Sequence, residues 1–316
     1  MRKGPRLNGR SLPHPIPYQG SKRLVAREIV AYFPGDVDTL IEPFAGSAAV
    51  TILAAASGLA KRFAISDSNA PLMALWDEIV SRPDALASAY AALWTEQEGD
   101  ERAFYDRIRA EFNRSHRPDH LLYLLARCVK ASVRYNAFGE FNQSPDNRRK
   151  GTRPCAMERH IHRTARLLAG RTHLKTGDFR DALSTAAPAD LIYMDPPYQG
   201  VVAGRDRRYW GNLSYAEFVE ALAALNESGL SYIVSYDGRN GLRSYGEALP
   251  ASLRLRHLSL SAGRSSQATL LGRNQQTIES LYLSSALVAR LRKSGRDRVI
   301  RAMPNDAHTT PGQLAL

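Results

Sequence analysis

Hydrophobic and polar positions follow two patterns along the chain. Short apolar runs bounded by glycine, proline or acidic residues predict buried strands, and longer runs with helical spacing predict helices. Strands are expected at 37–42, 62–66, 172–176, 191–194, 232–235, 253–260 and 277–283. Helices are expected at 23–33, 48–56, 179–183 and 215–226, over most of 71–170, and briefly after 285. Strands alternating with helices on both sides of a helical segment predict an α/β fold with a doubly wound sheet.

The same pattern suggests where the chain divides. Residues 1–14 are predicted to form a flexible arm, and residues 291–316 a loose tail that is first basic and then polar. The mostly helical segment 71–170 is interrupted near 133–153, where aromatic residues surround Gly139 and a basic stretch follows. This composition predicts a loop or a hairpin.

Small or acidic residues stand at the ends of four predicted strands, where ligands bind in open α/β sheets. They are the loop from Glu42 to Gly46, and Asp67, Asp178 and Asp195. Asp67 lies 21 positions beyond Gly46, close to the separation at which an acid meets a ribose hydroxyl pair. The pattern therefore indicates a nucleoside-containing cofactor, with its ribose at Asp67 and its adenine near Asp178 and Phe179.

Two of these acids have a second interpretation. Asp178 directly precedes a predicted helix, so it could serve only as the N-cap of that helix. Glu42 could equally shape the turn or the entry into the helix that follows. The sequence leaves both alternatives open.

The strand at 191–194 runs into Asp195, Pro196, Pro197 and Tyr198. The prolines stiffen the turn, and their carbonyls accept hydrogen bonds without a matching N–H donor. An accepting cluster beside an aromatic ring suits the exocyclic amine of a nucleobase, with Tyr198 stacked on the base. The alternative is an ordinary strand-to-loop turn, because Asp and Pro are common in turns.

The charge of the chain points to a polyanionic partner. Its 316 residues carry 43 Lys and Arg against 31 Asp and Glu, a net charge of +12 with an isoelectric point near 9.9. The excess is concentrated at 127–175, where twelve basic residues face three acidic ones, a net charge of +9. A merely solvated helix face would usually alternate in sign.

Several classes of protein are not expected. The two cysteines, Cys128 and Cys155, lack the spacing of metal ligands, which predicts no metal and a reducing, cytoplasmic environment. The basic N-terminus is not followed by the apolar region of a secretory signal. The longest stretch of small apolar residues, Ala48–Ala60, is too short to span a membrane.

Six motifs, in this order and spacing, resemble the Dam-type DNA adenine-N6 methyltransferases, the D12 class or alpha group. They are IPYQGSK (16–22), EPFAGSAAV (42–50), SDSN (66–69), RYNAFGEFN (134–142), GDF (177–179) and DPPY (195–198). The resemblance covers about 15–198, with weaker agreement in the last two strands. It implies a Rossmann-like class I methyltransferase sheet, mostly parallel with an antiparallel final strand. Residues 15–70 and 171–290 would form this catalytic domain, with a helical target-recognition domain inserted at 71–170.

The resemblance also implies the reaction, methyl transfer from S-adenosylmethionine to N6 of an adenine flipped out of double-stranded DNA. By position, Tyr18 and Lys22 belong to a cofactor-side motif, and Phe44 and Gly46 line the methionine end. The cofactor-binding residues expected are Tyr18, Lys22, Glu42, Phe44, Gly46, Asp67, Asp178, Phe179 and Asp195. The catalytic residues expected are Asp195, Pro196, Pro197 and Tyr198.

DNA binding would explain the basic segment. Phosphate contacts are expected from Arg148, Arg149, Lys150 and Arg153, and contacts with bases from Arg134, Tyr135, Asn136 and Asn142. Relatives that read GATC carry Leu-Arg where this chain has Ala137 and Phe138. Because arginine is a common reader of guanine, its loss leaves the target sequence open.

Two other functions stay open at this point. One is methylation of cytosine N4 or of an amine in RNA, although those relatives more often carry Ser or Asn where Asp195 stands. The other is a non-catalytic DNA-binding protein with the same fold. The sequence specifies neither a restriction, phage or orphan role, nor processivity, nor whether the expected monomer forms dimers.

Overall fold

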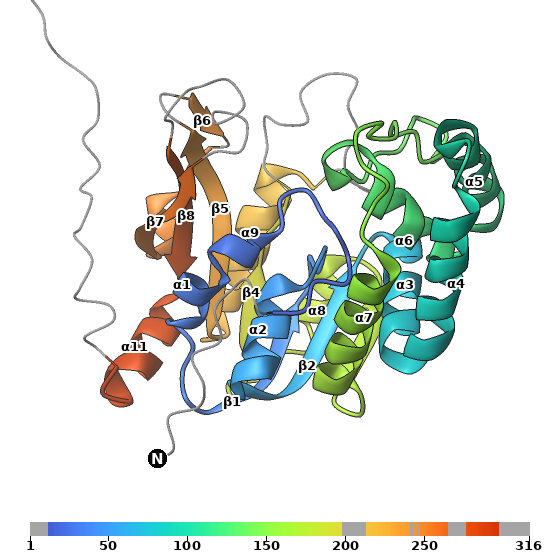
Figure 1. Ribbon diagram of the computed structural model, residues 1–316. Helices are drawn as coiled ribbons and strands as arrows, with labels where there is room; N and C mark the ends of the chain where they lie inside the picture. Colours follow the sequence, from blue (N-terminus) through green and yellow to red (C-terminus); the bar gives the residue numbers. More distant parts are fainter. Residues whose placement is uncertain (1–11, 198–212, 241–242, 246, 265–275, 297–316) are drawn as a thin grey trace, which may run out of the picture.

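The computed structural model describes residues 12–197, 213–240, 243–245, 247–264 and 276–296. Tyr198 and most of the expected N-terminal arm and C-terminal tail lie outside these residues. The described residues contain an eight-stranded sheet in the order β3-β2-β1-β4-β5-β8-β7, with β6 paired to β5 (Figure 1). The strands are β1 (Val37–Glu42), β2 (Ala60–Asp67), β3 (Thr172–Thr176), β4 (Leu191–Met194), β5 (Tyr232–Asn240), β6 (Arg243–Tyr245), β7 (Arg256–Arg264) and β8 (Gln276–Leu283).

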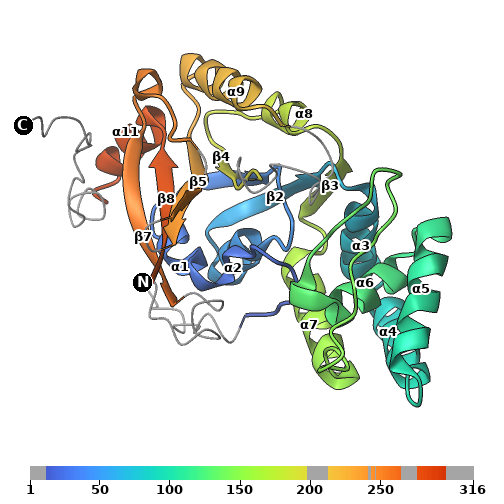
Figure 2. The ribbon, with the colours of Figure 1, turned by 90° about the horizontal axis from the view of Figure 1, so that it is seen from above.

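Helices cover the sheet and extend beyond one of its edges. They are α1 (Ala26–Val30), α2 (Ala49–Ser57), α3 (Ala70–Ser81), α4 (Pro83–Glu96), α5 (Glu101–Ser115), α6 (Pro118–Arg127), α7 (Pro154–Leu168), α8 (Phe179–Leu183), α9 (Tyr215–Glu227) and α11 (Ser285–Lys293). Short 3-10 turns are η2 (Lys22–Leu24), η3 (Val129–Ala131) and η4 (Ala251–Leu253). In Figure 2, α1 and α2 lie on one face of the sheet, and α8 and α9 lie on the other.

The sheet is parallel where the candidate site lies and antiparallel at its far end. Strands β3, β2, β1, β4 and β5 pair in parallel. Strand β8 runs antiparallel to both β5 and β7. The chain moves outward from β1 to β3 in one direction and from β4 to β5 in the other, so the strand order reverses between β1 and β4. Such a reversal is where open α/β sheets bind ligands, and the observed order confirms the fold class expected from the sequence.

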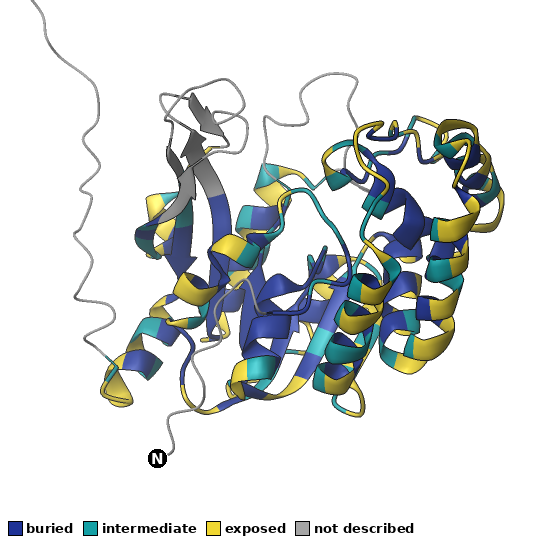
Figure 3. Cartoon of the chain, in the orientation of Figure 1, coloured by how far each residue is buried: buried dark blue, intermediate teal, exposed yellow. Residues whose placement is uncertain are grey.

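Successive residues of the central strands enter two separate cores because strand side chains alternate between the two faces of a sheet. Leu40 and Tyr193 belong to the core beneath α1 and α2. Ile41 and Ile192 belong to the core beneath α8 and α9. Both faces are therefore buried (Figure 3), which explains why β4 is apolar at every position and β1 is apolar at Val37, Leu40 and Ile41.

The strands at 37–42, 172–176 and 191–194 match the sequence prediction to the residue. The strand expected at 253–260 instead begins at Arg256, because Ala251–Leu253 form a 3-10 turn that ends at Arg254 with φ 52°. The helix expected at 23–33 is broken into η2 and α1. Pro34 follows its end, and a residue before proline disfavours the helical conformation.

Helices α3 to α7 gather at the β3 end of the sheet (Figure 1). Helix α3 packs against β2 and β3, and α7 packs against α2, α3 and α4. A continuous hydrophobic core runs from the sheet into these helices. The division into a catalytic domain and an insertion at 71–170 stays a prediction, and the shared core shows that the helical segment is packed firmly on the sheet.

Candidate functional site

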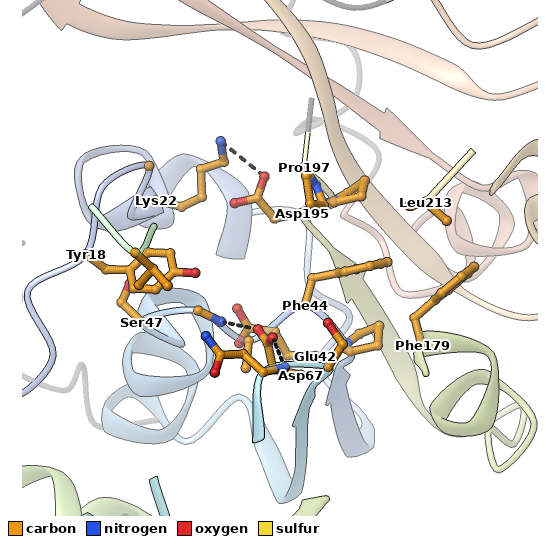
Figure 4. A pocket seen from close by; sticks show the side chains of 18 of the residues that line it. Tyr18, Lys22, Glu42, Phe44, Ser47, Asp67, Phe179, Asp195, Pro197 and Leu213 are labelled. Carbon is orange, nitrogen blue, oxygen red and sulfur yellow. Dashed lines mark hydrogen bonds and ion pairs between the residues drawn. The ribbon is translucent and has the colours of Figure 1, made fainter. Parts of the chain in front are cut away.

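A pocket lies at the carboxyl ends of β3, β2, β1 and β4. Because these strands are adjacent and parallel, the acids that follow them meet at one edge of the sheet, as the sequence predicts. The predicted site residues that line the pocket are Tyr18, Lys22, Glu42, Phe44, Gly46, Asp67, Asp178, Phe179, Asp195, Pro196 and Pro197. Figure 4 shows Asp67 and Asp195 on opposite walls, with the Phe44 ring between them.

The loop from β1 to α2 is held by hydrogen bonds at Gly46. Its N–H donates to Asp67 Oδ2 at 3.1 Å, and its carbonyl accepts from Trp76 Nε1 at 3.0 Å. Gly46 has φ +47°, and a Cβ on it would lie 3.1 Å from the Tyr18 ring. This position therefore favours glycine both for its backbone conformation and for the close approach of Tyr18.

Asp67 ties together the ends of three strands. Its Oδ1 accepts from the Asn69 N–H at 3.0 Å, and its backbone carbonyl accepts from the Gly177 N–H at 3.2 Å. Burial raises the pKa of the Asp67 carboxyl, and the N–H groups of Asn69 and Gly46 oppose that shift. Asp67 is thus a fixed acceptor at the floor of the pocket.

Two aromatic rings form the wall beside α8. Phe44 and Phe179 are stacked, with ring centroids 5.2 Å apart and an interplanar angle of 27°. The sequence placed Phe44 near the methionine end and Phe179 near the adenine. Figure 4 shows the two rings side by side, and the assignment of Phe44 to the methionine end stays a prediction.

Asp178 is the N-cap of α8, one of the two interpretations that the sequence left open, and its contact with adenine stays a prediction. It lines the pocket, and its side chain also caps α8 by accepting from the Arg180 N–H at 2.9 Å. The Arg180 guanidinium contacts both carboxylate oxygens, at 2.8 and 3.1 Å. These contacts with Arg180 lower the pKa of Asp178.

Glu42 is buried at the end of β1. It accepts from the Thr51 N–H at 3.2 Å and from the Thr51 hydroxyl, so it anchors the first turns of α2. Burial raises its pKa to about 8, against the opposing effect of the two Thr51 bonds. The side chain is therefore mostly protonated at neutral pH, and the helix-entry role accounts for its hydrogen bonds.

Asp195 directly follows β4 and lies 3.2 Å from Lys22 Nζ, with its side chain 21% exposed. Burial raises the pKa of Asp195 to about 6; Lys22 lowers it, and Glu279 raises it further. The carboxylate is therefore mostly ionised at neutral pH while still reaching the pocket. Pro196 is buried behind it, and Pro197 lines the pocket next to it.

Sequence reasoning missed several residues of this site. Glu279, on β8, binds Lys22 Nζ at 2.8 Å although the two residues are 257 positions apart. The Ser47 hydroxyl donates a hydrogen bond of 2.7 Å to the Ser21 hydroxyl, which links the N-terminal motif to the loop after β1. Asn69 was also missed. A local pattern indicated this residue, because it ends the SDSN motif and asparagine is a preferred N-cap, the role that it has for α3.

The loop or hairpin predicted near 133–153 is an irregular loop, with isolated bridges Cys128↔Pro145 and Tyr135↔Phe141. Tyr135, expected at the DNA, is 5% exposed, and its hydroxyl donates to Asn69 Oδ1 at 3.4 Å. The Asn136 amide oxygen accepts from the N–H groups of Phe138 and Glu140, both at 2.9 Å. In this structure Tyr135 and Asn136 therefore hold the loop together, and Phe138, 89% exposed, stands at its tip.

The expected phosphate-binding cations lie on the surface at the end of this loop, mostly in ion pairs. Arg148 and Arg149 both bind Asp146, at 3.1 and 2.8 Å, and hold its pKa well below the ordinary range. Lys150 binds Glu101 at 2.9 Å. Arg153 is exposed at the N-cap of α7, Asn142 is exposed, and Arg134 is partly buried. The four exposed cations thus differ in how far neighbouring acids already neutralise their charge.

The described residues offer neither a membrane-spanning helix nor a cluster of metal ligands. No helix among them is both long enough and apolar enough to cross a bilayer. No three His, Cys, Asp or Glu side chains within the same part of the chain are grouped as metal ligands.

The chain is similar to proteins of known activity over most of its length. The family model described as D12 class N6 adenine-specific DNA methyltransferase matches residues 18–269. The retron Ec67 DNA adenine methylase of Escherichia coli is 28% identical over 262 residues, 80% of this chain and 88% of that protein. The DNA adenine methylase of Serratia marcescens is 29% identical over 187 residues, 58% of this chain and 66% of its own length. The type II methyltransferase M.FokI of Planomicrobium okeanokoites is 22% identical over 85% of this chain and 42% of its own length.

Proposed function

Because the chain belongs to the D12 class of N6 adenine-specific DNA methyltransferases, we propose that it moves a methyl group from S-adenosylmethionine to N6 of an adenine flipped out of double-stranded DNA. The observation that carries this proposal is the pocket at the strand reversal, which joins Asp67, Phe179 and Asp195 along one edge of the sheet. A single pocket thus offers an acceptor for ribose, an apolar wall for a base and an acceptor for an amine.

The pocket fits S-adenosylmethionine by the chemistry of its side chains. The Asp67 carboxylate accepts the backbone N–H groups of Gly46, Ser68 and Asn69, and of its roughly four lone-pair sites one remains for a ribose hydroxyl. Phe44 and Phe179 offer ring surface to adenine, and Gly46 leaves open the space that a Cβ would fill. When bound, the cofactor supplies an electrophilic methyl group on a positively charged sulfur.

Asp195 and the Pro196 carbonyl would hold the target amine. The lone pair of adenine N6 is delocalised into the ring, so hydrogen bonds from N6 to these acceptors favour the more localised, tetrahedral amine. The ionised Asp195 carboxylate is suited to this at neutral pH, since its pKa is about 6. It need not be a strong base, because the N6 proton becomes acidic only after the methyl group has moved.

The target base must leave the DNA stack to reach this pocket, at a cost of a few kcal/mol. Tyr198 is proposed to stack on the extruded base and to offset about 1–3 kcal/mol of that cost. The loop around Phe138 and the cations near Arg153 are proposed to face the duplex, the cations contacting phosphates. The site of action would then be the cytoplasm, where the DNA is.

The first test is Asp195→Asn, which keeps the shape of the side chain and removes its charge. We expect single-turnover methyl transfer to fall by about 100-fold or more. Binding of cofactor and DNA should stay within about threefold of wild type. The matched control is Asp84→Asn, a carboxylate on α4 whose side chain is 93% exposed; it should methylate at the wild-type rate.

The product is identified by digesting the methylated DNA and measuring the modified nucleosides by mass spectrometry. N6-methyladenine is expected, and N4-methylcytosine would contradict the assigned target. A wild-type protein that binds both ligands without methylating DNA would support the non-catalytic alternative. Wild-type activity in Asp195→Asn would overturn the mechanism.

A further inference from the structure

Three charged side chains meet beside the pocket, and one comes from a strand outside the cofactor-binding half of the sheet. Lys22, in η2, contacts Asp195 after β4 at 3.2 Å and Glu279 on β8 at 2.8 Å. The side chains are 7%, 21% and 18% exposed, respectively. Figure 4 shows the Lys22 side chain directed at Asp195, with a dashed line marking their ion pair.

The two carboxylates share one ammonium group, which lies nearer to Glu279 than to Asp195. If Glu279 were absent, the Lys22 ammonium would pair with Asp195 alone. The Asp195 carboxylate would then be a weaker acceptor for any other donor. Because Glu279 also binds the Lys22 ammonium, the Asp195 carboxylate stays available to accept a hydrogen bond on its pocket side.

We propose that Glu279 is a positioning residue for methyl transfer: it holds the Lys22 ammonium so that Asp195 can accept a hydrogen bond from the target amine. The inference rests on the proposed function, since it assigns Asp195 the task described above. Glu279 itself does not line the pocket and acts only through Lys22.

The charged and titratable groups that interact with Asp195 among the described residues set the direction of the pH effect. Lys22 lowers the pKa of Asp195, whereas burial and Glu279 raise it. Glu42, from β1, and the Tyr193 hydroxyl, from β4, also interact electrostatically with Asp195. Burial raises the pKa of Glu42 to about 8 and raises that of Tyr193 further above its usual value, so both stay largely neutral near pH 6. Removing the charge of Glu279 should therefore lower the pKa of Asp195.

The test is Glu279→Gln, assayed by single-turnover methylation of duplex DNA between pH 5 and pH 9. We expect the plateau rate to fall by about 10- to 100-fold, since small misplacements of a reacting group have effects of that order. The acid limb of the profile should move to lower pH by roughly half a unit or more. Binding of S-adenosylmethionine, measured by calorimetry, should change by less than about threefold.

Two further variants separate positioning from folding or general charge. Glu220→Gln removes an exposed charge from α9 and should leave both rate and profile unchanged. Glu279→Asp keeps the charge, so its acid limb should stay near that of wild type even if the shorter side chain slows the reaction. If Glu279→Gln fails to fold, Glu279→Asp carries the test: a rate below wild type with an unmoved acid limb is expected, and a wild-type rate would overturn the inference.

The inference is overturned if Glu279→Gln keeps the wild-type rate, if its acid limb stays in place or moves to higher pH, or if the Gln and Asp variants shift the limb equally. These outcomes require an active wild-type enzyme. Failure of the proposed function is recognised separately, because the wild-type protein would then yield no N6-methyladenine at any pH.

Discussion

At the scale of single residues, Gly46 is the point at which four parts of the chain meet. Its N–H binds Asp67, its carbonyl binds Trp76, and the Tyr18 ring lies against it. A change at this residue should therefore disturb the proposed cofactor pocket more than the fold as a whole.

Gly46→Ala tests this arrangement. The new Cβ would lie 3.1 Å from Tyr18 Cε1 and so push the ring or the loop away from its place. We expect affinity for S-adenosylmethionine, measured by calorimetry, to fall about tenfold or more, a change of about 1.4 kcal/mol.

The control is Gly58→Ala at the end of α2. Gly58 also has a positive φ, +64°, but a Cβ on it would meet nothing within 4 Å. Both variants should lose about 1 kcal/mol of stability from backbone strain, and only Gly46→Ala should lose cofactor affinity. Equal losses of affinity would show that strain alone, and not the contact with Tyr18, governs the pocket.

At the scale of elements, the loop between η3 and α7 is held firmly at its base and exposed at its tip. Tyr105 donates to the Gln143 carbonyl at 2.8 Å, and the Asn113 amide binds both the N–H and the carbonyl of Phe141. Phe141 packs edge-on against Phe112 and Tyr135. A rigid base carrying an 89% exposed phenyl ring suits a contact with DNA bases.

Phe138→Ala tests that contact. Because the ring is exposed, the melting temperature should stay within about 1 °C of wild type. Affinity for duplex DNA should fall by about 1 kcal/mol or more, the range of a lost base-stacking contact, and the distribution of methylated sites should change. Leu24→Ala, which removes the other large hydrophobic side chain that is exposed among the described residues, serves as the control. Unchanged affinity and site distribution in Phe138→Ala would remove this tip from the DNA interface.

At the scale of the whole molecule, the net charge of +12 makes DNA binding depend on salt. The structure ranks the expected phosphate contacts by how far neighbouring acids already neutralise them. Arg153 is exposed and has no ion pair with any described residue, whereas Lys150 is bound to Glu101.

We therefore expect Arg153→Ala to lower the slope of log affinity against log salt concentration by about one. Lys150→Ala should lower it by less, since Lys150 must first leave Glu101. Both variants should weaken binding to all duplex sequences alike, measured by fluorescence anisotropy at four or more salt concentrations. A loss limited to one DNA sequence would assign the residue to base reading instead.

Much of the fold was predictable because its signals are local. Strands β1, β3 and β4 are each followed within two residues by glycine or proline, and their observed ends match the predicted ones to the residue. The acids after these strands were predictable as one cluster, since parallel strands align their carboxyl ends. The motifs then identified the family that the comparison confirms.

Other features follow from contacts between distant segments, which periodicity does not encode. Glu279 contacts Lys22 because β8 pairs antiparallel with β5. Tyr135 is buried because its hydroxyl binds Asn69 and its ring packs against Phe141. Phe44 stacks on Phe179 because α8 is packed beside the β1 loop. The residue types and their order along the strands thus set the chemistry available at the pocket, and the packing of segments far apart in sequence set the partners that tune the charge of Asp195.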